Sequence, residues 1–162
     1  MLPLRYLYIL ALVIWLGGML VAGLLVAPTV FGVLTAHDPE SGRVAAGLVF
    51  GTFLQRFHLL AYVAGGVMLV SLTLQRLLGP RPVSYGIRAG LIVVMLGLFG
   101  YSGMILAPRI ETLQREIGGP VASLAADDPR RVEFDGLHQL STVLLSLAAV
   151  GGLALIFWDA RE

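Results

Sequence analysis

Long apolar stretches alternate with short polar segments along the whole chain. Four of these stretches cover roughly residues 4–27, 57–78, 87–107 and 137–158. Each has about 20 residues or more, which is the length a helix needs to cross a hydrocarbon core about 30 Å thick. The pattern predicts an all-α fold, an integral membrane four-helix bundle that forms a single domain over residues 1–162.

The composition and the placement of charge agree with this prediction. Of the 162 residues, 57% are hydrophobic and 13% are charged, about half the charged fraction of a soluble domain. All ten Asp and Glu residues lie between or after the apolar stretches, where they avoid the cost of roughly 2.5–3.5 kcal/mol for a charge at the bilayer centre. The net charge of +1 does not indicate nucleic-acid binding, and the absence of Cys excludes disulfides and thiolate metal sites. We expect the lipid bilayer to be the main partner of the chain.

The first apolar stretch also has the order of features found in a secretory signal, with Arg5 followed by apolar and then small residues. The apolar region of a signal peptide usually has about 7–15 residues, and this stretch is longer. A similar pattern also recurs deep inside the chain. We therefore interpret residues 4–27 as a retained membrane helix.

The orientation is predicted from the connection between the second and third stretches. This connection is short, contains no carboxylate and carries Arg76, Arg81 and Arg88. Short connections rich in Arg are usually cytoplasmic. We therefore expect both termini to be cytoplasmic in a bacterial inner membrane, with the two longer loops outside. A plain count of the eleven arginines is less decisive, since five lie inside and six outside in this topology.

The second half of the chain resembles the first half. A shift of the chain by 80 residues aligns Gly17 with Gly97, Gly23 with Gly103, Pro28 with Pro108 and His58 with His138. We call this shift the repeat offset. Each half then contains a helix with glycines, an Ala-Pro exit, a polar excursion and a helix with a His in its first turn. The repeat predicts two helical hairpins related by an axis along the membrane normal.

The repeated prolines and glycines have a structural interpretation. A Pro removes a hydrogen bond from a helix and clashes with the preceding turn, so we expect Pro28 and Pro108 to mark helix ends or kinks. Small residues allow helices to approach closely in lipid. We expect this role for Gly17, Gly23, Gly97 and Gly103, either within the bundle or in a homo-oligomer.

Two of the three histidines, His58 and His138, open membrane helices at equivalent places of the two halves. In the predicted topology both lie near the outer face and oppose each other across the bundle, where four-helix proteins often hold cofactors. Paired imidazoles there could ligate the iron of haem b, share a transition-metal ion or bind a quinone. The alternative is that both are ordinary interfacial residues whose ring nitrogens bond to neighbouring Gln and Arg side chains.

Residues for catalysis are missing from the apolar stretches. These stretches contain no paired carboxylates, no Gly-rich phosphate loop followed by Lys, and no Ser or Thr beside a His–Asp pair. We therefore assign no catalytic residue, and the sequence does not indicate an enzyme. A non-catalytic scaffold or a transporter-like bundle without a cofactor, acting by self-association or with a membrane-protein partner, is the alternative to a cofactor-binding protein.

Three segments resemble one known family. They are "WLGGMLVAGLLVAPTVF" at 15–31, "FGTFLQRFHLLAYVAGGVMLVSL" at 50–72 and "GYSGMILAPRIETL" at 100–113. They are similar to the bacterial relatives of eukaryotic transmembrane protein 205, a four-helix membrane domain of unknown function. The resemblance covers nearly the whole chain and implies the same fold. In layout the family is similar to small four-helix membrane proteins linked to copper resistance and haem biosynthesis, whose functional histidines lie within their helices. The first span of this chain has no His, so that site is not carried over.

Overall fold

Four long helical rods make up the protein in its computed structural model, which describes residues 2–39, 41–79 and 82–161. The rods are Leu2–His37, Gly42–Leu78, Tyr85–Ile117 and Pro129–Asp159, and each is long and apolar enough to cross a membrane. Within the described residues there is no β-strand. The predicted all-α membrane bundle is confirmed, and the protein is a multi-pass membrane protein. Each predicted span falls inside one rod.

Two of the rods are interrupted by a wider, π-helical turn. The first rod consists of α1 (Leu2–Val21), the π-turn η1 (Ala22–Val26) and α2 (Ala27–His37). The third consists of α4 (Tyr85–Tyr101), the π-turn η2 (Ser102–Leu106) and α5 (Ala107–Ile117). The other two rods, α3 (Gly42–Leu78) and α6 (Pro129–Asp159), are continuous, and a short 3₁₀ turn η3 (Val121–Ser123) precedes α6.

The boundaries of these elements follow the repeat offset. Both π-turns have five residues, both following helices have eleven, and each element of the third rod ends at the position equivalent to the end of its counterpart in the first. Buried positions repeat as well: Tyr8 and Arg88, Leu12 and Ile92, Trp15 and Met95, Met68 and Ala148, Ser71 and Gly151, and Leu72 and Gly152. Equivalent helices therefore present equivalent faces to the core, which supports the predicted internal repeat.

The two repeated prolines lie inside the rods, each at the start of a helix that follows a π-turn, so of the two expected roles, helix end or kink, they do not end a rod. Pro28 and Pro108 are each the second residue of an eleven-residue helix. The amide of the preceding alanine bonds to the carbonyl five residues back, from Ala27 to Ala22 and from Ala107 to Ser102. A π-turn adds one residue to the helical ring. It thereby accommodates a proline that lacks an N–H and would clash with a carbonyl in a regular α-helix.

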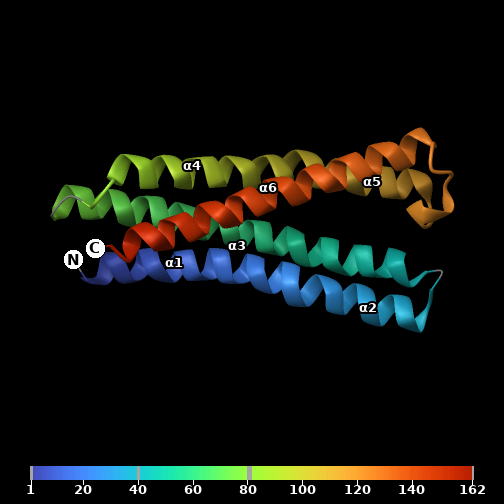
Figure 1. Cartoon of the computed structure of the whole chain (residues 1–162), viewed down its shortest axis with the longest axis horizontal. Coiled ribbons are helices and arrows are strands. Elements are labelled where there is room, and N and C mark those ends of the chain that lie inside the picture. Colours follow the sequence, from blue (N-terminus) through green and yellow to red (C-terminus); the bar gives the residue numbers. More distant parts are fainter. Residues whose placement is uncertain (1, 40, 80–81, 162) are drawn as a thin grey trace.

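The four rods form a closed ring at one end and separate at the other. α1 packs against α3, α3 against α4, α4 against α6 and α6 against α1. Both termini lie at the closed end, and beyond the π-turns the pair α5–α6 diverges from the pair α2–α3 (Figure 1). Helices bend at prolines and at π-turns, so the divergence has a local cause. We call this second end the open end.

Charged side chains join the helix ends at the closed end. The guanidinium of Arg88 is 1% exposed and lies 3.2 Å from the Oδ1 of Asp159. It also lies over the ring of Tyr8, 4.8 Å from its centroid. Arg5 forms a longer ion pair with Asp159, at 3.6 Å, and donates to the backbone oxygen of that residue. These contacts tie α1, α4 and α6 together.

The glycines that permit close helix packing are mostly not the predicted ones. A methyl group on Gly103 would lie 2.5 Å from the Tyr62 hydroxyl, but one on Gly17, Gly23 or Gly97 would meet nothing within 4 Å. Close approaches to side chains of neighbouring helices also occur at Gly18, Gly65, Gly151 and Gly152, and a methyl group on Gly42 would press on the backbone of α2 at Leu34. A role of the open glycines in self-association stays a prediction.

Replacing Asp159 by Asn should destabilise the fold, because it removes the carboxylate that faces the buried Arg88. We expect the free energy of unfolding to fall by about 2–3 kcal/mol, less than the roughly 3–5 kcal/mol of a fully buried pair, because the Asp159 side chain is 14% exposed. Glu111→Gln is the control: it breaks an exposed pair with Arg115 and should cost less than about 1 kcal/mol. Unfolding in mixed detergent micelles measures both. Equal, small losses would show that the ion pair has no structural role.

Candidate functional site

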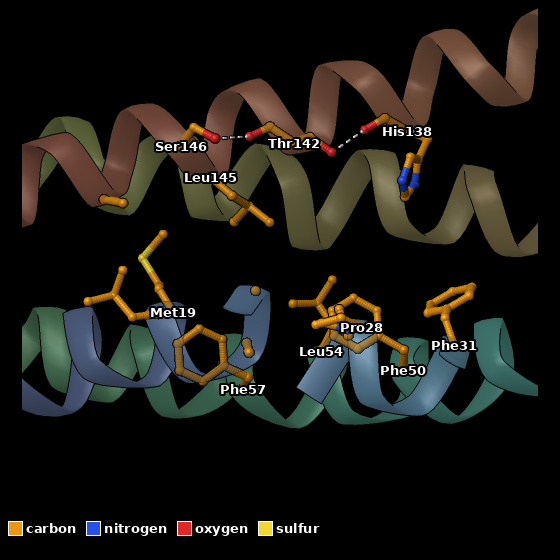
Figure 2. A pocket seen from close by; sticks show the side chains of 15 residues that line it. Met19, Pro28, Phe31, Phe50, Leu54, Phe57, His138, Thr142, Leu145 and Ser146 are labelled. Atoms are coloured by element: carbon orange, nitrogen blue, oxygen red, sulfur yellow. Dashed lines mark hydrogen bonds between the residues drawn. The ribbon is translucent and has the colours of Figure 1, made fainter. Parts of the chain in front are cut away.

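A groove lies where the two hairpins separate, between α6 on one side and η1, α2 and α3 on the other (Figure 2). Its volume is about 560 Å³, within the range of roughly 300–1,000 Å³ that is typical of small-molecule sites. The groove begins beside the end of α1 and continues along α2. It therefore exists because the π-turns and prolines bend the rods apart.

The two walls of the groove differ in chemistry. The wall made by the first rod and α3 is apolar, with Met19, Pro28, Phe31, Phe50, Leu54 and Phe57 among its side chains. The wall made by α6 carries His138, Thr142 and Ser146 (Figure 2). These three residues are four positions apart and share one face of the helix. We call them the polar strip.

The hydroxyls of the polar strip use their protons within α6. Thr142 Oγ1 donates to the backbone oxygen of His138 at 3.0 Å, and Ser146 Oγ donates to that of Thr142 at 2.8 Å. A hydroxyl has one proton and two lone pairs, so both side chains offer only acceptors to a ligand. The ring of His138 is stacked beside that of Phe134, with centroids 6.2 Å apart and planes 2° from parallel.

The π-turn opposite the strip adds a main-chain acceptor. In a regular α-helix the carbonyls of Gly23 and Leu24 would accept from residues 27 and 28. Here the Ala27 amide bonds to Ala22, and Pro28 has no N–H. The Gly23 carbonyl therefore loses its α-helical donor Ala27, and the next residue, Pro28, cannot replace it; Gly23 is one of the residues that line the groove.

The polar strip runs from the beginning of the apolar span of α6 toward its middle. His138 lies one turn after the last charged residue before the apolar span, Asp135. Thr142 and Ser146 follow about 6 Å and 12 Å further along the helix axis, at about 1.5 Å per residue. All three side chains are exposed at the side of the bundle, so the groove is accessible from the lipid.

His58 lies outside this groove, in the interface between α3 and the third rod. It is 4% exposed, and its ring centroid lies 5.3 Å from that of Phe99 and 6.2 Å from that of Tyr62. Its Nδ1 is 2.8 Å from the Leu54 carbonyl, which can only accept, so we infer that Nδ1 carries the proton. Its Nε2 is then an acceptor, and among the described residues this buried atom has no hydrogen-bond partner.

The structure therefore does not bring His58 and His138 into one cavity. α3 and α6 lie diagonally in the ring of four helices, and His58 packs against Phe99 of α4 and close to Gly103. The predicted pairing of the two imidazoles across the bundle stays a prediction. Within the described ranges there is also no group of three or more His, Cys, Asp or Glu residues that could hold a metal ion.

The groove is the open counterpart of the closed interface around His58. At the repeat offset, His58, Tyr62, Phe99 and Gly103 correspond to His138, Thr142, Met19 and Gly23. The first four pack together, and the second four all line the groove. The sequence comparison paired the histidines and glycines. It missed Thr142 and Ser146, although their spacing from His138 within an apolar span was a signal.

These features define a polytopic membrane protein, a four-helix bundle with a groove at its side. The model of a domain of unknown function, DUF4149, matches residues 10–118, and the chain belongs to this family. The match includes His58 but ends before α6, so the polar strip lies outside it. No curated protein and no solved structure matches the chain. The narrower resemblance to transmembrane protein 205 stays a prediction.

The repeat provides a matched test of the closed interface. Gly103→Ala should destabilise the fold by about 1–3 kcal/mol through overpacking, because the new methyl group would lie 2.5 Å from the Tyr62 hydroxyl and 2.6 Å from the Cδ2 of His58. Gly23→Ala, at the equivalent open position, should stabilise by up to about 1 kcal/mol through helix propensity. Unfolding of both variants in mixed micelles measures the difference. The same effect at both glycines would contradict the asymmetry between the two interfaces.

Proposed function

We propose that the protein is a membrane-embedded binding protein that holds an amphipathic, lipid-soluble molecule in the groove. The observation that carries this proposal is the polar strip, which places His138, Thr142 and Ser146 opposite an apolar wall inside a membrane span. Polar groups in hydrocarbon are costly unless they are hydrogen-bonded. The hydroxyls of Thr142 and Ser146 meet this requirement by donating to carbonyls of α6, and their lone pairs remain available to a ligand that donates hydrogen bonds.

The depth of the strip gives the ligand a direction. His138, at the surface level of the bilayer, would contact the most polar part of the molecule. Thr142 and Ser146 would accept hydrogen bonds deeper in the groove, since their own protons are engaged by the helix. Leu145, Ala149 and Met19 line the groove with them and would hold an apolar tail.

A haem b or a transition-metal ion between His58 and His138 is the second candidate. The observation in its favour is the buried Nε2 of His58, which has no partner among the described residues. The placement of only His138 in the groove favours the groove proposal. An absorption spectrum and a metal analysis of the purified protein separate the two. A Soret band or a stoichiometric metal that disappears in both His58→Ala and His138→Ala would support the second candidate.

Filling the groove should prevent occupancy without changing the fold. Ala149→Trp places a large side chain in the groove, whereas Val150→Trp changes the neighbouring position, where the wild-type side chain is 62% exposed and outside the groove. With a long-chain alcohol that carries a photoreactive diazirine, added to protein in nanodiscs, we expect labelled peptides from the groove. The Ala149 variant should lose this labelling at least tenfold, and the Val150 variant should retain it. Labelling spread over all lipid-facing residues in proportion to their exposure would refute the proposal.

A further inference from the structure

We infer that the ligand of the groove carries an aromatic ring with a hydroxyl group, that is, a phenol or hydroquinone attached to an apolar chain. This inference rests on the proposed function and specifies its ligand. It follows from a comparison of two interfaces that are equivalent in the repeat. The interface around His58 is closed by the protein's own side chains, whereas its counterpart is the open groove.

At the closed interface the protein supplies the ring itself. The phenol of Tyr62 reaches across from α3 and donates to the carbonyl of Phe99 at 3.1 Å. It lies beside the imidazole of His58, and the Tyr62 hydroxyl and the His58 ring both border the site where Gly103 has no side chain. A phenol, an imidazole and a glycine backbone therefore fill this interface together.

At the groove the equivalents of the residues around the Tyr62 ring are present, but the ring itself is absent. His138 and Gly23 are retained at the positions of His58 and Gly103, whereas Thr142 replaces Tyr62. A methyl group added to Gly103 would clash with neighbouring side chains, whereas one added to Gly23 would meet nothing within 4 Å. A ligand ring at this position would have an imidazole and a glycine for neighbours, as the Tyr62 ring does.

Hydrogen bonding at the groove favours a ligand that donates. The Thr142 and Ser146 hydroxyls offer lone pairs, because their protons bond to carbonyls of α6. The carbonyl of Gly23 has lost its helical donor to the π-turn. A phenolic hydroxyl supplies the missing donor, whereas an ether or a bare hydrocarbon does not.

The opposite wall of the groove suits a flat ring. Phe31, Phe50 and Phe57 line it, and Phe31 and Phe50 are already in edge contact, with centroids 6.3 Å apart. Aromatic rings gain from offset or edge-to-face contacts beyond simple area burial. The aromatic wall favours a flat ring and the polar strip favours a hydroxyl group, so both favour a phenol.

Three matched compounds test the inference as competitors of the photoreactive alcohol in nanodiscs. These are 4-nonylphenol, 4-nonylanisole and nonylbenzene, which share the chain and the ring and differ only in the hydroxyl. We expect the phenol to suppress labelling of the groove at a concentration at least tenfold below that of the other two. Thr142→Val should remove most of this advantage, because Val has a similar shape but no acceptor.

A second variant tests the equivalence of the two interfaces. Thr142→Tyr places a phenol where the repeat has Tyr62, and it should abolish labelling of the groove as the ligand does. Val143→Tyr is the control, since Val143 does not line the groove. Equal competition by all three compounds would overturn the inference on the ring hydroxyl while the proposed function stands. Failure of all three, with no labelling specific to the groove, would overturn the proposed function itself.

Discussion

The structure depends on how each of two membrane helices accommodates a proline. Lipid offers no hydrogen bonds, so main-chain groups within a span must be satisfied by the protein. The chain meets this constraint at Pro28 and Pro108 by widening one turn, so that the alanine before each proline bonds five residues back. The widened turns bend the first and third rods at equivalent levels. The separation of the two hairpins at the open end, and the groove between them, follow from this local solution.

The two halves share this backbone but use it differently. The buried stripes of α1 and α4 match at the repeat offset, and the closed end is held by a charge cluster around Arg88 and Asp159. Toward the open end the match fails. Tyr62 and Phe99 fill the interface of α3 with α4, and their counterparts Thr142 and Met19 leave the interface of α6 with the first rod open. A repeat in the backbone thus allows one interface to be filled by side chains and the other to remain open as a groove.

The sequence predicted the architecture well and the site only in part. Apolar length and the positions of charges define spans in a bilayer, because both reflect the solvent directly. The alignment of the two halves also identified the repeat. The positions of the prolines in the sequence could not show that Pro28 lies inside a helical rod. That depends on the π-turn, in which the Ala27 amide bonds to the Ala22 carbonyl, and this hydrogen bond leaves no mark in the sequence. Nor could the sequence show that Gly65 packs closely whereas Gly97 does not, because that depends on helix rotation. The same rotation places His58 in an interface and His138 in a groove.

The bilayer also determines how such a groove can be selective. Moving an apolar tail from lipid into the groove gains little, because lipid chains are as apolar as the groove wall and compete for the same space. Discrimination must therefore come from contacts that lipid chains cannot make. In this protein those contacts are the lone pairs of Thr142 and Ser146, the imidazole of His138 and the aromatic wall. The hydroxyls of Thr142 and Ser146 donate within α6, so what they offer in an apolar span is their lone pairs, which would favour a hydrogen-bond donor over lipid in the groove.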